Sequence, residues 1–355
     1  MTSDCQPWRG EVRICVCAEC GAVQAPVDEQ WRRNMEKIYR AYDTYAAAGG
    51  EEQKVLDADG MSSRSRVLVE WLVSLGTVPA SGEILDVGCG RGAFLAEFSR
   101  KFHDWTLSGT EFDDRNVEVL RKLSRFETLQ TARFEDLQGE HDFISMIHVL
   151  EHIEDPVACL TALHRRARDG ALLLVQVPDW SENPFALAIA DHATHFTPRV
   201  LEQVARMAGW EPVAAPSHIV PKELTLLARA GEVAAADQSA DQTDASRLEQ
   251  RLNWLQGVRR QAQGLDESAA RCGIFGTAVA GTWLAACCKR GDFFVDEDPS
   301  RVGRKHLGVP IFSPFQVPAD ADVFVGMAPM VSSRLAGKYA GAAARYHAVH
   351  SLDSL

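Results

Sequence analysis

Residues 84–92 read Ile-Leu-Asp-Val-Gly-Cys-Gly-Arg-Gly, an apolar stretch that runs directly into a glycine-rich turn. A strand buried on both faces of a parallel sheet is typically a continuous apolar run. Gly88, Gly90 and Gly92 allow the backbone to turn sharply and to approach a ligand closely, because glycine has no Cβ atom. The nonapeptide therefore predicts an α/β fold with a parallel sheet and a nucleotide-type binding turn at the end of one strand.

The glycine spacing leaves two classes of ligand open. Gly88-x-Gly90-x-x-Ala93 also satisfies the fingerprint of NAD-type dinucleotide sites. Asp86 separates the two classes, because a carboxylate at the base of the turn repels a pyrophosphate and attracts an ammonium group. A ligand with an amino-acid end and no phosphate is favoured, and S-adenosyl-L-methionine is such a ligand.

Apolar periodicity around this turn predicts alternating helices and strands. Asp155-Pro156 and Thr197-Pro198 mark two helix starts, since each places a capping side chain before a proline at the first helical position. Strands are expected at 83–87, 105–110, 142–148, 171–177, 211–215 and 224–228, and helices at 67–75, 93–101, 156–168 and 198–208. This order predicts a doubly wound sheet that closes with an antiparallel strand pair.

A second, smaller α/β unit follows a small, polar and acidic stretch at 231–246, which predicts a linker. A helix is expected from about Arg247, and Cys272-Gly-Ile-Phe-Gly-Thr-Ala-Val-Ala-Gly281 predicts a strand, a second glycine turn and a buried helix. Further elements are expected at 293–298, 322–327 and 332–344. We divide the chain into a cysteine-rich segment with a capping helix (1–55), a cofactor-binding domain (56–232), a linker and helix (233–265) and a C-terminal Rossmann-like α/β domain (266–355).

Carboxylates follow two further strands of the cofactor-binding domain. Glu111 ends the second strand, about 20 residues after the glycine turn, where a carboxylate can accept both ribose hydroxyls. Glu135 and Asp136 lie where a third strand should end, and an acidic side chain there can accept a hydrogen bond from the exocyclic amine of adenine. A solvated loop is the alternative for this acidic pair.

The first 25 residues hold Cys5, Cys15, Cys17 and Cys20. Cys17-Ala-Glu-Cys20-Gly has the spacing of a knuckle in which two thiolates and a glycine turn bind zinc. The pattern is incomplete, because its first half is reduced to Cys5, and Cys15 and Cys17 would point to opposite sides of an extended chain. A structural zinc ion and small buried cysteines both stay open. Residues 31–48 predict an amphipathic helix.

Composition narrows the range of partners. The formal net charge is −12 over 355 residues, and the basic residues are scattered, so nucleic acid is not an expected partner. No basic-plus-apolar leader and no apolar stretch long enough for a bilayer are present, so no membrane association is expected. We expect a cytoplasmic monomer or homodimer that acts on a small-molecule substrate.

The fourth strand ends Ile147-His148-Val149-Leu150-Glu151-His152-Ile153-Glu154-Asp155-Pro156. With the Asp86 turn and Glu111, this string resembles the class I S-adenosylmethionine-dependent methyltransferases over roughly residues 64–230. The resemblance implies their seven-stranded Rossmann-like sheet. It also implies that Asp86 and the backbone of Gly88, Cys89, Gly90 and Gly92 hold the methionine portion, that Glu111 binds ribose, that Phe112 flanks adenine and that His148 lies beneath the cofactor.

The whole chain resembles a narrower group, the bacterial sugar C-methyltransferases, which act on nucleotide-linked keto-deoxysugars. The resemblance rests on the cysteine knuckle, the methyltransferase core and a tail with Gly-x-Phe-Gly-Thr and Val-Asp-Glu-Asp-Pro. It implies that the tail helps to hold the nucleotide, with Gly276 and Asp296 as substrate-binding residues. The group's catalytic string has only a partial counterpart here, in Asp191-His192-Ala193-Thr194-His195-Phe196.

Methyl transfer from a sulfonium needs a positioned and deprotonated acceptor more than an activated methyl group. We therefore predict His192 as the base, oriented by Asp191. His152, His195 and one tyrosine of the predicted helix, Tyr39, Tyr42 or Tyr45, would line the acceptor pocket. Packing of these side chains in the core is the alternative for each.

Three functions remain open from the sequence. The first is a methyltransferase for a nucleotide-linked sugar or a related natural-product intermediate, with carbon as the acceptor atom and an O- or N-acceptor as the alternative. The second is an NAD-dependent oxidoreductase, which Asp86 disfavours. The third is a non-catalytic, cofactor-binding partner subunit.

Overall fold

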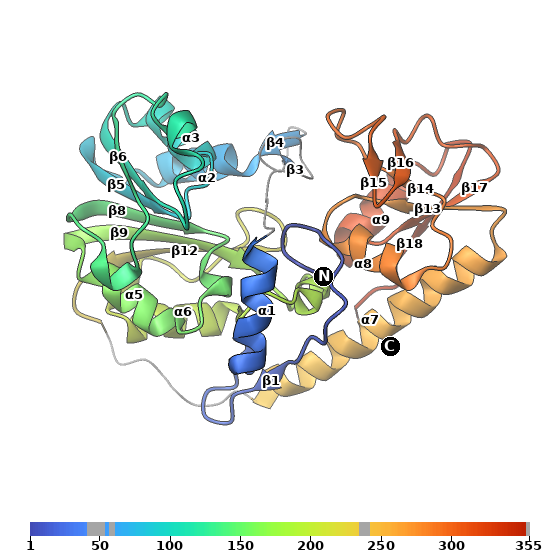
Figure 1. Ribbon diagram of the computed structural model, residues 1–355, viewed down its shortest axis with the longest axis horizontal. Helices are drawn as coiled ribbons and strands as arrows, with labels where there is room; N and C mark the ends of the chain where they lie inside the picture. Colours follow the sequence, from blue (N-terminus) through green and yellow to red (C-terminus); the bar gives the residue numbers. More distant parts are fainter. Residues whose placement is uncertain (41–53, 57–60, 234–241, 353–355) are drawn as a thin grey trace.

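A computed structural model describes residues 1–40, 54–56, 61–233 and 242–352 of the chain. Two α/β units lie side by side, and helix α1 (Glu29–Arg40) stands in front of the space between them (Figure 1). The long helix α7 (Gln242–Ser268) runs along the lower edge of the view into the second unit. No helix in the described ranges is both long and apolar enough to cross a membrane.

The first unit is built on a seven-stranded sheet with strand order β11-β12-β9-β8-β5-β6-β7. The five strands from β9 to β7 in this order are parallel, and β12 pairs antiparallel with both β9 and β11. This confirms the doubly wound sheet with a closing antiparallel pair. The strands are β5 (Ser81–Val87), β6 (Asp104–Thr110), β7 (Phe126–Gln130), β8 (His141–Ile147), β9 (Ala167–Pro178), β11 (Trp210–Pro212) and β12 (Glu223–Ala230).

Helices cover both faces of this sheet because successive strand residues point to opposite sides. Ile84 packs in one cluster with helices α2 (Arg64–Leu75) and α3 (Ala93–Lys101), whereas its neighbour Leu85 packs in another with α5 (Pro156–His164) and α6 (Pro198–Met207). The two predicted helix starts are confirmed. Asp155 accepts a hydrogen bond from the N–H of Ala158, and Thr197 accepts one from Val200.

Several predicted boundaries differ from the structure. The third strand, β7, ends at Gln130, and residues 134–136 form a separate 3-10 turn, η1 (Phe134–Asp136), because the chain leaves the sheet edge first. The predicted helix 156–168 ends at His164, since residues from Ala167 join the long strand β9. Helix α7 starts at Gln242, inside the predicted linker. The short helix α4 (Val117–Leu120) was not predicted.

The second unit is also a Rossmann-like sheet, of six strands in the order β15-β16-β14-β13-β17-β18, which confirms the smaller C-terminal α/β domain. The five strands from β16 to β18 are parallel, and β13 lies at their centre. The elements are β13 (Arg271–Phe275), α8 (Val279–Cys287), β14 (Phe293–Val295), β15 (Lys305–His306), β16 (Val309–Phe312), β17 (Ala321–Val325), α9 (Pro329–Lys338) and β18 (Arg345–Ala348).

Helix α7 joins the two units through one shared apolar core. Trp254 and Leu255 on α7 pack in one cluster with Phe185 of the first unit and Ile274 of the second. At the polar edge of the same contact, Arg251 Nε donates to the carbonyl of Ser181 at 2.7 Å. Because one buried cluster contains residues of both units, the structure fixes the two sheets relative to each other.

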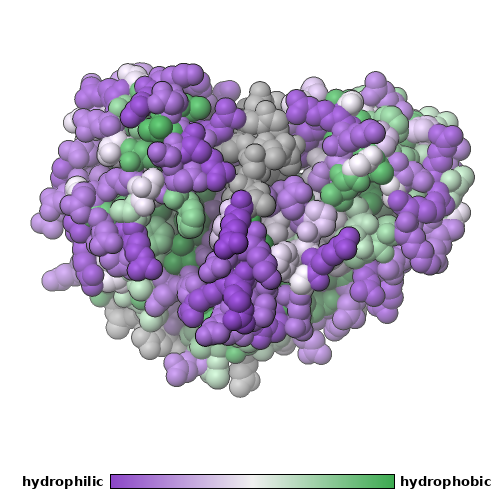
Figure 2. Space-filling model, in the orientation of Figure 1, coloured by the Kyte–Doolittle hydropathy of each residue, from purple (hydrophilic) through white to green (hydrophobic). Residues whose placement is uncertain are grey.

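The N-terminal segment adds a small sheet against the first unit. β2 (Val23–Gln24) pairs with β1 (Cys15–Val16) and with β10 (Thr194–His195). Helix α1 buries Trp31, Met35 and Ile38 and presents a charged outer face, visible as the hydrophilic column in Figure 2. The remaining described elements are the pair β3 (Lys54–Leu56) and β4 (Met61–Ser63) and the 3-10 turns η2 (Leu150–His152) and η3 (Pro184–Ala188).

Candidate active site

The glycine turn lies at the carboxyl end of the central strand β5, the predicted place for a ligand. Gly88, Gly90 and Gly92 all have positive φ, at 69°, 53° and 79°, a region that favours glycine. Asp86, two residues before the turn, is almost completely buried and accepts a hydrogen bond from Ser145 Oγ at 2.7 Å. This contact fixes the orientation of the carboxylate within the strand end.

Glu111 extends its carboxylate from the end of β6 towards the glycine turn. Oε1 accepts a hydrogen bond from the N–H of Gly90 at 2.5 Å, and Oε2 accepts one from Phe112 at 3.1 Å. The ring of Phe112 is 88% exposed to solvent and stacks against Tyr39 of α1, with centroids 6.3 Å apart. An acidic group and an aromatic face therefore lie next to each other beside the turn.

His148 follows β8 and lies between two buried carboxylates. Its Nδ1 is 3.1 Å from Oε1 of Glu151, and its Nε2 is 3.3 Å from Oε2 of Glu223. His148 has a positive φ of 54°, and its N–H donates to the carbonyl of Gln176, which holds this unusual backbone in place. Burial by itself would raise the pKa of Glu151, but the hydrogen bond from His148 and the neighbouring charges of His148 and His152 lower it.

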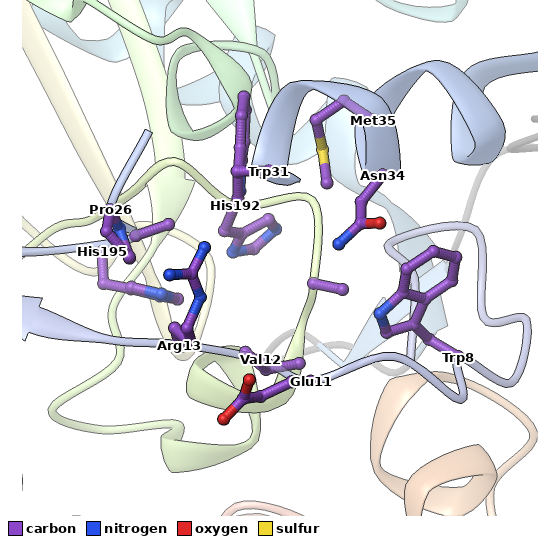
Figure 3. Close-up of a pocket in the computed structure, with 12 residues that line it drawn as sticks. Trp8, Glu11, Val12, Arg13, Pro26, Trp31, Asn34, Met35, His192 and His195 are labelled. Carbon is purple, nitrogen blue, oxygen red and sulfur yellow. The ribbon is translucent and has the colours of Figure 1, made fainter. Parts of the chain in front are cut away.

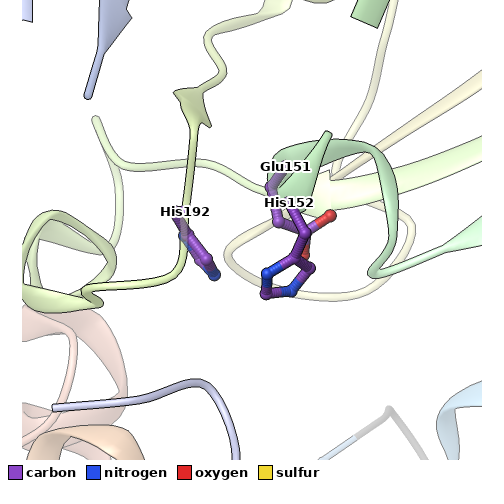
Figure 4. A group of neighbouring side chains, drawn as sticks. All are labelled: Glu151, His152 and His192. Carbon is purple, nitrogen blue, oxygen red and sulfur yellow. The ribbon is translucent and has the colours of Figure 1, made fainter. Parts of the chain in front are cut away.

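Glu151, His152 and His192 form the second group of the site (Figure 4). A carboxylate oxygen of Glu151 and one ring nitrogen of each histidine lie within 4.8 Å of one another. The two imidazole rings meet edge to face with centroids 5.0 Å apart. The N–H of Ala193 donates to the carbonyl of Glu151 at 2.7 Å, which holds the segment around His192 against turn η2.

Asp191 contacts His152 in the structure, and this differs from the predicted pairing of Asp191 with His192. Nδ1 of His152 donates to the carbonyl of Asp191 at 2.9 Å and lies 3.4 Å from its carboxylate. The Asp191 carboxylate accepts hydrogen bonds from the N–H and Oγ of Ser3. These hydrogen bonds commit the Asp191 carboxylate to Ser3 and the neighbourhood of His152.

His192 and His195 are both buried. Burial is the largest cause that lowers the pKa of His192 well below its ordinary value, and the nearby His152, His195 and His148 lower it further. Burial lowers the pKa of His195 to about 4. Both imidazoles are therefore neutral at neutral pH.

A pocket between the N-terminal segment, α1 and the 190–195 loop includes His192 and His195 in its wall (Figure 3). Its other lining residues are Trp8, Glu11, Val12, Arg13, Ala25, Pro26, Trp31, Asn34, Met35 and Ala190. Aromatic and apolar groups thus lie on the side of His192 that faces the N-terminal segment. The role of His195 at the edge of an acceptor pocket stays a prediction.

Other predicted residues lie away from this group. Glu135 and Asp136 are exposed in turn η1, beyond the end of β7, and the adenine contact stays a prediction. Tyr42 and Tyr45 lie outside the described residues, whereas Tyr39 of the same predicted helix places its hydroxyl 3.2 Å from Nδ1 of His152. Cys89 is buried beside the glycine turn, and burial raises its pKa strongly, so it is a packed thiol.

The four N-terminal cysteines do not come together as one ligand set in the described part of the chain. The expected knuckle turn does form, because Gly21 has a φ of 73° and its N–H donates to the carbonyl of Cys17. Hydrogen bonds from the backbone N–H groups of Cys20 and Glu19 lower the pKa of the Cys17 thiol. Cys15 instead donates to the carbonyl of Gln24 at 3.3 Å, and Cys5 lies near the carbonyl of Ser3. The zinc site stays a prediction that this arrangement does not support.

The second glycine turn follows β13 in the C-terminal domain. Gly276 has a φ of 88°, and a Cβ on Gly281 would lie 1.9 Å from the carbonyl oxygen of Gly276, so helix α8 and the turn pack backbone to backbone. Asp296, a predicted substrate ligand, forms hydrogen bonds with residues beside this turn. One oxygen accepts hydrogen bonds from the N–H and Oγ1 of Thr277, and the other accepts one from the N–H of Asp298.

Two buried residues of the site, Glu223 and Ser145, were not expected from the sequence. Glu223 starts β12, far along the chain from His148, and no motif marks it. Ser145 is the one polar residue in the stretch 143–147 of β8, and this was the one signal that could have identified it. Glu151 belongs to the string 147–156 after the fourth strand, and the sequence predicts no role for it.

Comparison of this chain with known proteins agrees with the Rossmann-like fold of its first unit. Residues 62–215 match the family model described as "Methyltransferase domain". A ubiquinone biosynthesis O-methyltransferase of Cereibacter sphaeroides is 29% identical over 151 residues, which are 37% of this chain and 60% of that protein. A protein of the same description from Thiobacillus denitrificans is 26% identical over 155 residues, 37% of this chain and 66% of that one. The match thus spans about three fifths of the first relative's length.

Solved structures of methyltransferases match this chain with low sequence identity and low TM-scores. A 1,6-didemethyltoxoflavin-N1-methyltransferase of Burkholderia thailandensis is 16% identical, with a TM-score of 0.41 over 62% of this chain and 100% of that chain. A magnesium protoporphyrin IX methyltransferase of Synechocystis is also 16% identical, with a TM-score of 0.36 over 47% of this chain and 78% of that chain.

The chain therefore carries a class I S-adenosylmethionine-dependent methyltransferase domain, which the family model places at residues 62–215. The residues present fit the cofactor of this class. Asp86 supplies a carboxylate for an ammonium group, Glu111 supplies one for ribose hydroxyls, and Phe112 supplies an exposed aromatic face. S-adenosyl-L-methionine would supply an electrophilic methyl group there.

Proposed function

We propose that the protein is an S-adenosylmethionine-dependent methyltransferase for a small-molecule acceptor. The observation that carries this proposal is the buried Asp86 carboxylate, directly before a turn of three positive-φ glycines and beside the carboxylate of Glu111. A negative group at the base of the turn disfavours a pyrophosphate, which argues against an NAD-type oxidoreductase.

The acceptor side is the group of Glu151, His152 and His192. Glu151 and His152 follow β8, the strand next to β5, and His192 precedes β10. An acceptor must lose a proton before or during methyl transfer, and its oxygen or carbon must face the methyl group in line. The prediction gave the base to His192. The contacts of Asp191 support His152 as the imidazole that Asp191 orients, with His192 facing it. We assign the promotion of proton loss to these two histidines together.

A nucleotide-linked sugar, or a related natural-product intermediate, is the substrate class that we propose. The support is the second Rossmann-like domain, whose glycine turn lies at the N-terminus of the nine-residue helix α8. Arg301 is beside this turn: its Nη1 donates to Thr277 Oγ1 at 2.8 Å and to Asp296 at 3.4 Å, and its Nε lies 3.8 Å from a carboxylate oxygen of Asp298. A guanidinium at a helix N-terminus suits the phosphates of a nucleotide.

The atom that receives the methyl group is proposed as carbon, from the resemblance to sugar C-methyltransferases. The relatives described above are named O-methyltransferases, which favours an oxygen acceptor as the second candidate. Mass spectrometry of products formed with isotopically labelled methyl donor, over nucleotide sugars and small phenols, distinguishes the two. A carbon-linked label in a nucleotide sugar is the expected result, and label on a non-nucleotide oxygen would refute the substrate class.

The cofactor proposal is tested by calorimetry with S-adenosylhomocysteine and NADH. We expect S-adenosylhomocysteine to bind and NADH not to bind. Asp86→Asn keeps a hydrogen-bond acceptor for Ser145 but removes the charge, so binding should weaken about ten- to a hundredfold. Asp114→Asn, an exposed acid-to-amide change after β6, is the matched control and should leave the affinity unchanged. Unchanged affinity in Asp86→Asn would exclude this site as the methyl-donor site.

Binding of S-adenosylhomocysteine without methylated product from any acceptor would instead favour the third function, a cofactor-binding partner subunit.

A further inference from the structure

The group of Glu151, His152 and His192 has the composition of a metal site. Two neutral imidazoles and one carboxylate are the ligands of open, three-residue sites for divalent cations such as zinc. The three residues come from two segments, turn η2 and the loop before β10, which the hydrogen bond from Ala193 to Glu151 holds together. Figure 4 shows the two rings directed towards each other.

The spacing suits a cation after only small side-chain movements. Ligand atoms at about 2.1 Å from a tetrahedral ion lie about 3.4 Å apart. In the structure the three ligand atoms already lie within 4.8 Å of one another. A movement of up to about 1 Å at each side-chain tip would close this difference.

The charge balance also points to a cation. Glu151 is 2% exposed, and no described residue donates a hydrogen bond to its Oε2. Asp191 is completely buried, and its carboxylate lies 3.4 Å from the His152 ring. Buried carboxylates are costly unless a positive charge or donors surround them. A divalent cation between the imidazoles would supply that charge.

The outer contacts resemble those that orient metal ligands in proteins. Glu151 is held by His148, and His152 is held by the carbonyl of Asp191 and flanked by the hydroxyl of Tyr39. Such outer partners fix ring orientation and contribute to metal affinity. His192 also lines the pocket beside α1.

We propose that Glu151, His152 and His192 bind a divalent cation of the zinc type, with open coordination positions for an oxygen of the methyl acceptor. The role in catalysis rests on the proposed function, whereas the binding of the cation does not. With the keto oxygen of the acceptor on the cation, the neighbouring carbon would release its proton to water, the electron pair left on that carbon would form the bond to the methyl carbon, and the carbon–sulfur pair would return to sulfur.

Cobalt(II) is the probe for this site, because its visible absorption reports the ligands directly. The measurements use the full chain with Cys17→Ser and Cys20→Ser, so that thiolates do not contribute. We expect one equivalent of cobalt and weak visible bands without strong near-ultraviolet sulfur absorption. His192→Ala and Glu151→Gln should each weaken binding by at least about tenfold.

His195→Ala is the matched control, since His195 is also a buried histidine of this segment but is not in the ligand group. Its cobalt affinity should equal that of the parent, with circular dichroism confirming that every variant is folded. The proposal is overturned if the folded parent binds no cobalt, or if His192→Ala binds it with unchanged affinity.

Calorimetry with S-adenosylhomocysteine on the same samples separates this proposal from the proposed function. Binding of S-adenosylhomocysteine without cobalt binding would refute the metal site alone. Binding of cobalt without S-adenosylhomocysteine would support the metal site and refute the methyl-donor proposal.

Discussion

The contact between the glycine turn and the loop after β8 gives a quantitative prediction. Gly88 has a φ of 69°, and a Cβ built on it would lie 2.4 Å from Cγ2 of Val149. Ordinary carbon contacts are about 3.5–4.0 Å, so the methyl group of alanine would overlap Val149 by more than about 1 Å. Val149 lies between His148 and turn η2, so any relaxation would displace the histidines of the site.

The expected cost of Gly88→Ala has two parts. The left-handed backbone costs a residue with a Cβ about 1–2 kcal/mol, and the overlap costs about 1–3 kcal/mol. Urea unfolding should therefore show a loss of about 2–5 kcal/mol in the free energy of unfolding. Val149→Ala removes the atom that the new methyl group meets, so it should rescue the steric part and leave the backbone part.

A double-mutant cycle measures this rescue. Gly88→Ala and Val149→Ala together should be more stable than the sum of the single changes predicts, by about 1–3 kcal/mol. The affinity for S-adenosylhomocysteine should follow the same order in the four proteins. A coupling energy of zero would mean that Gly88 does not meet Val149, and the structural explanation of the first glycine would be refuted.

Two further predictions concern the C-terminal domain. Gly281→Ala should destabilise that domain by at least about 3 kcal/mol in urea unfolding, since its Cβ would lie 1.9 Å from the backbone oxygen of Gly276. Gly264→Ala lies at an open position within α7 and should raise the free energy of unfolding by about 0.5–1 kcal/mol. Equal effects of the two would contradict the packing. The hydrogen bond from Arg345 is the main cause that lowers the pKa of Asp322. The stability that this carboxylate contributes is therefore present above its unfolded pKa of about 3.9 and is lost as the pH falls through its pKa in the folded protein. Urea unfolding should show that Asp322→Asn is less stable than the parent at pH 7 and equally stable at acid pH.

The fold was predictable because its signals are local. The apolar run before Gly88 gave the central strand, and the proline caps at Asp155 and Thr197 gave two helix starts, since both depend on neighbouring residues. The third strand was placed wrongly near residues 134–137. It is a short edge strand with exposed and half-buried residues, so its pattern lacks the apolar run of a central strand.

The cofactor side of the site was more predictable than the acceptor side. Asp86 and Glu111 follow strands of one parallel sheet, and parallel strands bring their carboxyl ends to the same edge. The partner of Asp191 and the carboxylates around His148 depend on loops and on a strand about 75 residues further along the chain. Contacts between such distant segments are set by tertiary packing, and no spacing in the sequence encodes them.

The sequence by itself determined that this chain has a doubly wound sheet, a glycine turn with an acidic base and a second small α/β domain. Periodicity, glycine and charge act over a few residues, so these features can be predicted from one sequence. Only the tertiary structure decided that Asp191 contacts His152, that Glu151 joins two histidines and that Asp296 holds its own turn. These outcomes required segments that are far apart in the chain to pack together, and packing alone selects which polar side chains meet.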